Sequence, residues 1–195
     1  MTTERVLLIG MMGVGKTTVG RLLADRVGAD YIDNDDLVRR RSGRGVAEIL
    51  EQSGEPALRE AERSAFVEAL AVPGRTVIGV PGGMVLDPAD RALVADAGSP
   101  VVWLRARPET IAKRVEGTDR PWLGDDPLAS LTRLAADRHP LYAEAAHVVV
   151  DVDHLTPEQA AETAARLLGA GADGPGAAAT TAADTMGFHD RTGGV

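Results

Sequence analysis

Residues 6–18 read VLLIGMMGVGKTT, in which an apolar run leads directly into a complete G-x-x-x-x-G-K-[ST] phosphate-binding loop. Such loops bind nucleotide phosphates where a buried strand turns into a helix, because their glycines let successive backbone N–H groups face the phosphates. Lys16 can reach the β- and γ-phosphate oxygens, and the Thr17 hydroxyl can ligate Mg2+. The residues that we expect to bind the nucleotide are Gly13, Val14, Gly15, Lys16, Thr17 and Thr18.

The main alternative is that this stretch is an ordinary glycine-rich helix start. The composition argues against it, because Lys16 and Lys113 are the only lysines in a chain that otherwise uses arginine. A compact ammonium group fits between phosphates where a rigid planar guanidinium fits poorly. A lysine retained at this position of the loop therefore favours phosphate binding.

The bulk composition indicates one acidic domain. The chain has 195 residues, a formal net charge of -8 and no cysteine. We place the domain at residues 1–168 and expect residues 169–195, rich in Gly and Ala without an apolar period, to be a disordered tail. The negative charge disfavours nucleic acid as a partner, and the lack of cysteine excludes disulfides and thiolate metal sites. Without a signal peptide or a membrane-spanning run, we expect a cytoplasmic monomer that does not bind a membrane.

Helical and strand-like periods alternate along the chain, which is typical of an α/β domain with a parallel sheet. Strands are expected at residues 5–9, 31–32, 76–80, 101–104 and 147–150. Helices are expected at residues 16–27, 35–41, 46–53, 55–71, 108–115, 127–138 and from 156 onward. Residues 116–127 lack periodicity and should form a loop, and Pro140 should disturb or end the helix before it.

Two acidic residues, Asp33 and Asp35, directly follow the second expected strand. Ligands of open parallel sheets bind at the carboxyl ends of the strands, so both carboxylates should face the same crevice as the phosphate-binding loop. One could hold magnesium through a water molecule, and the other could accept a proton from a substrate hydroxyl. The alternative is that one of them only caps the following helix.

Three arginines, Arg59, Arg120 and Arg138, carry no signal by spacing alone. Each lies in a polar stretch that would ordinarily be a solvated surface. Their significance comes from the order of the motifs along the chain, which resembles that of the shikimate kinases over about residues 5–168. The matching motifs are residues 10–18, Asp33-Asn34-Asp35, residues 41–44, Gly54-Glu55 with Leu58-Arg59 and Glu62, Gly82-Gly83, Arg120-Pro121 and Arg138-x-Pro140-Leu141-Tyr142.

The resemblance implies a fold and a reaction. The implied fold is the three-layer P-loop kinase fold, with a five-stranded parallel sheet, helices on both faces and a mobile lid at about residues 116–127. The implied reaction is transfer of the γ-phosphoryl group of ATP, with Mg2+, to the 3-hydroxyl of shikimate, a small acid of aromatic amino-acid biosynthesis.

Residue roles also follow from the resemblance. The implied catalytic residues are Lys16, Asp35 as the base, and Arg120 as a lid arginine over the phosphates. The implied metal-binding residues are Thr17 and, through water, Asp33. The implied substrate-binding residues are Asp35, Arg59, Gly82, Gly83 and Arg138, with the two arginines gripping the substrate carboxylate. Arg114 is the expected adenine-contacting residue.

Three departures from the family pattern concern the acceptor pocket. Pro81 stands where the family usually has glycine, which removes a backbone donor, and Leu50 and Leu58 stand where phenylalanine is usual. The departures leave open a related kinase that phosphorylates another hydroxylated acid or a cyclitol in secondary metabolism. A nucleotide switch is disfavoured because neither lysine lies in an Asn-Lys-x-Asp pattern. A binding module without chemistry is disfavoured by the acidic pair.

Overall fold

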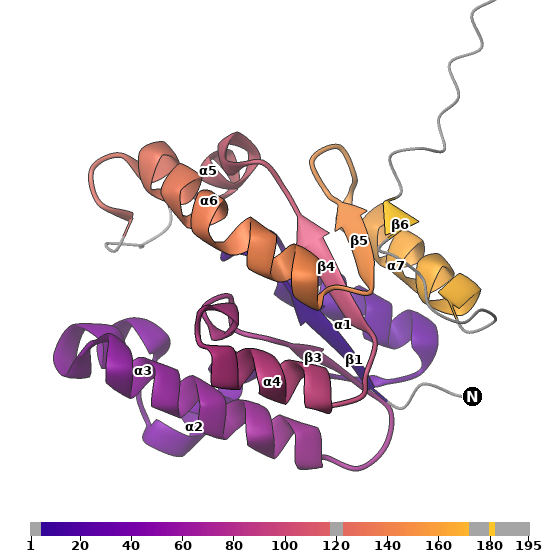
Figure 1. Ribbon diagram of the computed structural model, residues 1–195, viewed down its shortest axis with the longest axis horizontal. Coiled ribbons are helices and arrows are strands. Elements are labelled where there is room, and N and C mark those ends of the chain that lie inside the picture. Colours follow the sequence, from indigo (N-terminus) through magenta and orange to yellow (C-terminus); the bar gives the residue numbers. More distant parts are fainter. Residues whose placement is uncertain (1–4, 118–122, 172–179, 182–195) are drawn as a thin grey trace, which may run out of the picture.

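The structure is a computed structural model that describes residues 5–117, 123–171 and 180–181. A parallel sheet with the strand order β2-β3-β1-β4-β5-β6 forms its centre (Figure 1). The strands are β1 (Arg5–Ile9), β2 (Asp30–Asp33), β3 (Thr76–Gly79), β4 (Val101–Arg105), β5 (Val148–Asp151) and β6 (Thr180–Thr181). The five expected strands are therefore confirmed, and the two-residue β6 extends the sheet beyond β5.

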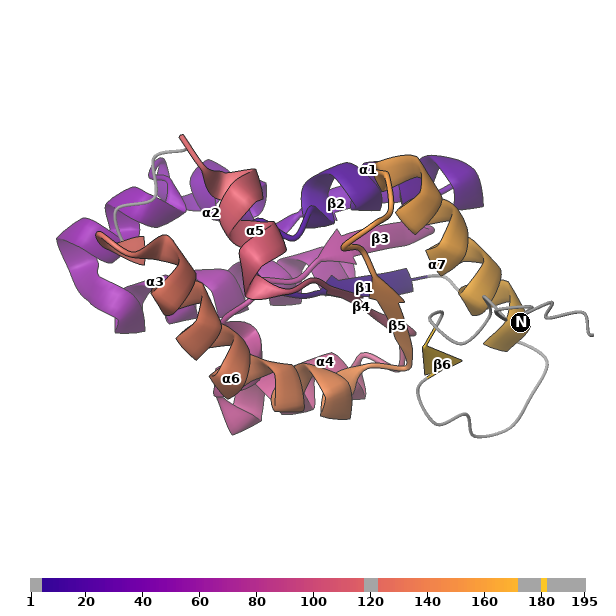
Figure 2. The ribbon, with the colours of Figure 1, turned by 90° about the horizontal axis from the view of Figure 1, so that it is seen from above.

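Helices cover both faces of the sheet. Figure 2 shows α1 and α7 on one side of it and α4 and α6 on the other. The helices are α1 (Lys16–Val27), α2 (Asn34–Ser42), α3 (Val46–Ala71), α4 (Pro88–Asp96), α5 (Pro108–Val115), α6 (Pro127–Ala145) and α7 (Pro157–Gly171), with a 3-10 turn, η1 (Met84–Leu86). Within the described ranges, no helix has the length and apolarity needed to cross a membrane.

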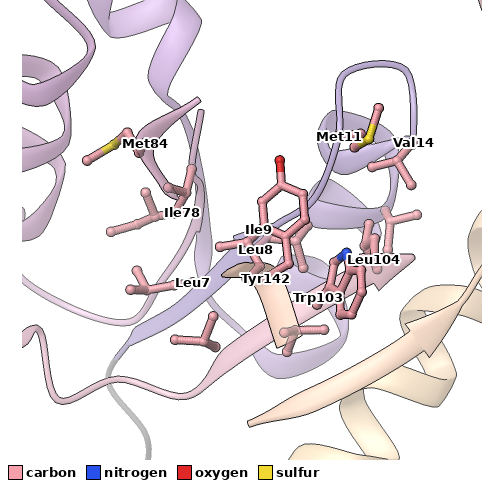
Figure 3. Packing of buried hydrophobic residues seen from close by; sticks show 14 of the residues in the cluster. Leu7, Leu8, Ile9, Met11, Val14, Ile78, Met84, Trp103, Leu104 and Tyr142 are labelled. Carbon is pink, nitrogen blue, oxygen red and sulfur yellow. The ribbon is translucent and has the colours of Figure 1, made fainter. Parts of the chain in front are cut away.

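The core surrounds β1, in which every residue after Arg5 is apolar because both faces of the strand are covered. Leu7, Leu8 and Ile9 are at most 1% exposed, and they pack with side chains of β3, β4 and α6 (Figure 3). β1 pairs with β3 on one side and β4 on the other. The loops that follow β1, β2 and β3 consequently leave the sheet at one edge, where ligands of parallel sheets bind.

Most helices begin and end close to the residues expected from the sequence. One helix was not predicted, and the predicted end of another is wrong. Within α3, Gly54 has φ +79 and separates the two helices expected there. The helix α4 was not predicted, although Asp87 caps it, with its carboxylate accepting from the Ala89 N–H at 2.7 Å, and Pro88 suits its first position.

The expected end of α6 near Pro140 is wrong, because the helix continues to Ala145. Its buried face contains Leu131, Ala135, Arg138 and Tyr142, so it runs across the proline without a break. The Tyr142 hydroxyl is anchored to the Gly82 carbonyl at 2.7 Å. Packing of this face offsets the backbone hydrogen bond that the proline removes.

The ends of the domain and the lid are only partly described. The last helix, α7, extends to Gly171, three residues past the expected boundary at residue 168. Most of the predicted tail, and the centre of the predicted lid at residues 118–122, lie outside the described residues. Of the residues that flank this gap, Leu123 is buried and the Asp126 carboxylate caps α6.

Candidate active site

A cavity of about 540 Å³ opens at the carboxyl edge of the sheet, between the phosphate-binding loop, α2, α3 and the middle of α6. Its wall contains most of the residues predicted from the sequence. These are Gly13, Gly15, Lys16, Thr17, Thr18, Asp33, Asp35, Arg59, Gly82, Gly83 and Arg138. Segments far apart in the chain thus contribute to one space.

The phosphate-binding loop has the backbone shape that its glycines predict. Gly13 and Gly15 have φ values of +74 and +107, a region that other residues rarely adopt. The helix α1 begins at Lys16, and no side chain caps its N-terminus. Its first backbone N–H groups can therefore bind an anion, which the helix dipole also favours.

Lys16 lies inside the curled loop. Its Nζ donates to the carbonyl oxygens of Gly10 at 2.8 Å and Met11 at 3.1 Å. Burial lowers the pKa of Lys16 to about 8, although the nearby carboxylates of Asp35 and Asp33 oppose this shift. Added phosphate charge would favour the protonated form of this amine.

Asp33 caps a helix and also contacts the phosphate-binding loop, so its carboxylate does more than cap α2. Its Oδ1 accepts from the Asp35 N–H at 3.0 Å at the start of α2, and its Oδ2 accepts from the Thr17 hydroxyl at 2.8 Å. Within the described ranges, no cluster of three or more His, Cys, Asp or Glu side chains could hold a metal ion. A hydroxyl beside one carboxylate fits Mg2+ bound with a nucleotide, because this ion usually retains water and phosphate oxygens.

Asp35 lies on the cavity wall, where water still reaches its side chain. Partial desolvation inside the cavity, and then the neighbouring Asp33 carboxylate, raise the pKa of Asp35, whereas Lys16 lowers it. Asp35 in turn influences the pKa values of Lys16 and Glu62. It is therefore within electrostatic reach of both the loop and the α3 side of the cavity.

Arg59 is paired with two carboxylates from its own helix. Its guanidinium donates to Glu55 at 2.9 Å and forms a short ion pair with Glu62, which is 4% exposed. Burial raises the pKa of Glu62, and Arg59 opposes the shift. A Cβ atom at Gly83 would collide with this guanidinium, so the glycine permits the arginine to lie against the backbone.

Arg138 is 7% exposed, and no carboxylate of the described residues lies within ion-pair distance of it. Its Nε is buried and has no hydrogen-bond partner among these residues. A buried guanidinium without an anion is unfavourable. Because Arg138 also lines the cavity, an anionic ligand there would supply the missing charge.

Two of the described residues predicted for the site do not line the cavity, and a third predicted residue is not described. Val14 is buried beneath the loop. Arg114 lies on the loop's other side, where it donates to the carbonyl oxygens of Val14 at 3.0 Å and Val152 at 2.6 Å. Arg120 lies outside the described residues.

The residues that depart from the family pattern form part of the wall. Leu50 and Leu58 line it together with Val46 and Leu134. Leu58 is 4% exposed, so it belongs to the core as much as to the cavity. Pro81 lies two residues beyond the end of β3, beside Gly82 in the same wall.

Some side chains that support the site were given no role from the sequence. The pairing of Glu55 and Glu62 with Arg59 could have been found from their i,i+4 and i,i+3 spacing on one helix. The contact of Tyr142 with Gly82 spans sixty residues, and no local pattern indicates it. Tyr31, predicted only as part of a strand, also lines the cavity.

Known proteins are similar to this chain in sequence. The family model described as Shikimate kinase matches residues 12–168. A shikimate kinase of Symbiobacterium thermophilum is 44% identical over 152 residues, covering 76% of this chain and 86% of that protein. One from Thermobifida fusca is 43% identical over 169 residues, covering 86% and 96%.

A solved structure matches the fold. Shikimate kinase from Acinetobacter baumannii in complex with shikimate superposes with a TM-score of 0.82 at 29% identity, covering 87% of this chain and 95% of that one. Since the family model spans most of the chain and the relatives are aligned over nearly their whole length, this chain belongs to the shikimate kinase family.

Proposed function

We propose that this protein transfers the γ-phosphoryl group of ATP to the 3-hydroxyl of shikimate, giving shikimate 3-phosphate and ADP. One observation carries the proposal: a phosphate-binding loop and the buried guanidinium of Arg138, which has no carboxylate partner among the described residues, open into the same cavity. The loop suits the phosphates of the nucleotide, and the guanidinium suits the carboxylate of an acid acceptor. Membership of the shikimate kinase family supports shikimate as that acid.

The nucleotide side of the site uses residues 13–18. Backbone N–H groups at the start of α1 and the Lys16 ammonium would bind the phosphates, and Arg114 would lie near the adenine. Thr17 and, through water, Asp33 would hold Mg2+. When bound, the ion neutralises charge on the phosphate oxygens.

The acceptor side uses Asp35 and two arginines. Arg59 and Arg138 would bind the carboxylate, and the Gly82-Gly83 backbone would approach the ring. As the substrate hydroxyl oxygen forms its bond to the γ-phosphorus, the bond between that phosphorus and the β–γ bridging oxygen breaks. Asp35 would take the hydroxyl proton, and ADP would leave.

We further propose that residues 116–127 form a lid that brings Arg120 over the phosphates and excludes water. We also propose that the enzyme acts as a monomer. The acidic charge of -8 disfavours nucleic acid, and we propose a cytoplasmic enzyme whose partners are the nucleotide and a small acid.

An acceptor panel tests the proposed reaction. With ATP and Mg2+, ADP release should be saturable with shikimate and absent with quinate, gluconate and neutral cyclitols, because only the right acid satisfies both arginines and Asp35. Turnover confined to another acid or to a cyclitol would show that this compound, and not shikimate, is the acceptor. The change in specificity would then be attributed to Pro81, Leu50 and Leu58.

The base is tested by Asp35→Asn, which preserves the shape of the side chain and removes its proton acceptor. We expect kcat to fall by about 10²–10⁴-fold with a smaller change in the KM for shikimate. The matched control is Asp36→Asn, because Asp36 is the next acid of α2 and pairs with Arg39 at 3.6 Å outside the cavity. A kcat for the Asp35 variant equal to that of the control would rule out the base.

The carboxylate clamp is tested by Arg59→Ala. We expect shikimate binding to weaken by about 2–5 kcal/mol, seen as a raised KM. Because this variant leaves Glu62 buried without its cation, the double variant Arg59→Ala with Glu62→Gln separates the two effects. The double variant should regain folding stability but not acid affinity, and recovery of affinity would show that Arg59 only neutralises Glu62. Arg41→Ala, which breaks an exposed ion pair with Glu68, serves as the control.

The charge of Lys16 is tested by calorimetry of binding of a non-hydrolysable ATP analogue in buffers of different ionisation enthalpy. Above pH 8 the free protein holds Lys16 partly neutral, and bound phosphates favour the ammonium form, so binding should take up a proton. The uptake should pass through a maximum between pH 8 and the higher pKa of the bound state, and it should vanish well below pH 8. Lys113→Ala should retain the uptake, whereas Lys16→Ala should lose it. Binding of the analogue without uptake across this range would contradict the lowered pKa.

A further inference from the structure

Tyr31 lies at the phosphate end of the cavity, and the reaction proposed above does not use it. Tyr31 and Asp33 are two residues apart on β2, so their side chains leave the same face of the strand. The Tyr31 hydroxyl donates to Asp33 Oδ2 at 3.3 Å, and the same oxygen accepts from the Thr17 hydroxyl at 2.8 Å. With the Asp35 N–H on Oδ1 at 3.0 Å, three donors from the strand, the loop helix and α2 hold one carboxylate.

Two glycines make room for the Tyr31 side chain. A Cβ atom at Gly20 of α1 would overlap the ring, and a Cβ atom at Gly79 of β3 would lie 2.5 Å from the hydroxyl oxygen. Gly79 is the register partner of Asp33, so the hydroxyl sits over the strand pair that carries the carboxylate.

Neither glycine is required by the backbone. Gly20 and Gly79 are absent from the residues with positive φ, and glycine is less favourable than alanine inside a helix or strand. What both positions share is their approach to Tyr31. The packing therefore accommodates a large aromatic side chain between α1, β2 and β3 at a cost to the elements around it.

Packing explains why an aromatic ring stands at position 31, but it does not explain why the ring carries a hydroxyl. A phenylalanine would fill the same space without a polar group to desolvate. Burial, and then the Asp33 carboxylate, raise the pKa of Tyr31, so its hydroxyl stays protonated and can only donate to that carboxylate near neutral pH. The hydroxyl thus supplies a permanent donor to the residue proposed to hold the metal's water.

We propose that Tyr31 is a positioning residue whose hydroxyl, together with that of Thr17, orients the Asp33 carboxylate toward the Mg2+ of the bound nucleotide. The inference rests on the proposed function, in which Thr17 and Asp33 hold that ion. Groups that hydrogen-bond to a metal-binding carboxylate fix its orientation, and their loss usually lowers metal affinity. The 3.3 Å separation is longer than an optimal hydroxyl–carboxylate bond and can shorten when the ion binds.

The test is Tyr31→Phe, which removes only the hydroxyl and keeps the ring between the two glycines. Binding of a non-hydrolysable ATP analogue is titrated with Mg2+ and again with a chelator. The gain in affinity that Mg2+ confers should fall by about tenfold, while metal-free binding and the KM for shikimate stay at wild-type values. If Mg2+ raised the affinity of the variant for the analogue as much as that of the wild type, the proposal would be overturned. An equal loss of affinity with and without the ion would also overturn it.

Tyr142→Phe is the matched control, because Tyr31 and Tyr142 are the only tyrosines of the chain and the Tyr142 hydroxyl bonds to Gly82 on the acceptor side. It should leave the Mg2+ gain intact. Gly79→Ala is a second variant, since its Cβ must displace the Tyr31 hydroxyl while every side chain of the metal site remains. It should reproduce the loss of the Mg2+ gain, and a wild-type gain in Gly79→Ala would contradict the role of the hydroxyl.

The binding measurement separates this inference from the choice of acceptor. If the wild-type protein binds the analogue more tightly with Mg2+ but does not phosphorylate shikimate, the proposed acceptor fails and the role of Tyr31 is still decided by the variants. If Mg2+ gives the wild-type protein no gain, the metal role of Asp33 fails and the positioning role fails with it.

Discussion

The burial of β1 at the centre of a parallel sheet is the constraint on which the rest of the structure depends. Leu7, Leu8 and Ile9 can be excluded from water only if strands lie on both sides of β1 and helices cover both faces. Because neighbouring strands are parallel, each crossover returns the chain to the amino ends of the strands, and every strand then ends on the same, carboxyl side of the sheet. The loop after β1, Asp33 at the end of β2 and Pro81 beyond β3 therefore lie close together on that side of the sheet, where they line the cavity.

The cavity has separate cationic groups for the nucleotide phosphates and for the carboxylate of an acid acceptor. Lys16 lies within the electrostatic reach of Asp33 and Asp35, whereas Arg59 is held by Glu55 and Glu62. Within the described part of the chain, neither Lys16 nor Arg138 has a carboxylate at ion-pair distance, and Lys16 instead donates to the carbonyl oxygens of Gly10 and Met11. An acid acceptor would balance Arg138, and nucleotide phosphates would balance the loop. Two separate anion requirements in one cavity are a physical basis for a phosphotransferase that selects an acid.

Much of this site could be predicted from the sequence, because its elements are local. Strand, glycine-rich turn and helix follow one another within residues 5–27, and the acidic pair sits two residues apart at a strand end. The order of the remaining motifs identified Arg59 and Arg138 through family resemblance, whereas their spacing alone left both as surface residues. The course of α6 across Pro140 was mispredicted, since the local effect of a proline competes there with burial of Tyr142, which only the packed structure reveals.

The sequence by itself determined the class of the domain, its phosphate-binding loop and the residue types that its chemistry needs, because these are written in short-range patterns of hydrophobicity and glycine. Only the tertiary structure decided which charges are paired and which are not, and which side chains support the reacting groups. Tyr31 packs against Gly20 and Gly79, and Tyr142 reaches Gly82, across separations that no periodicity links. Such contacts form when distant segments are brought together by the shared core, so their geometry depends on the whole packed chain.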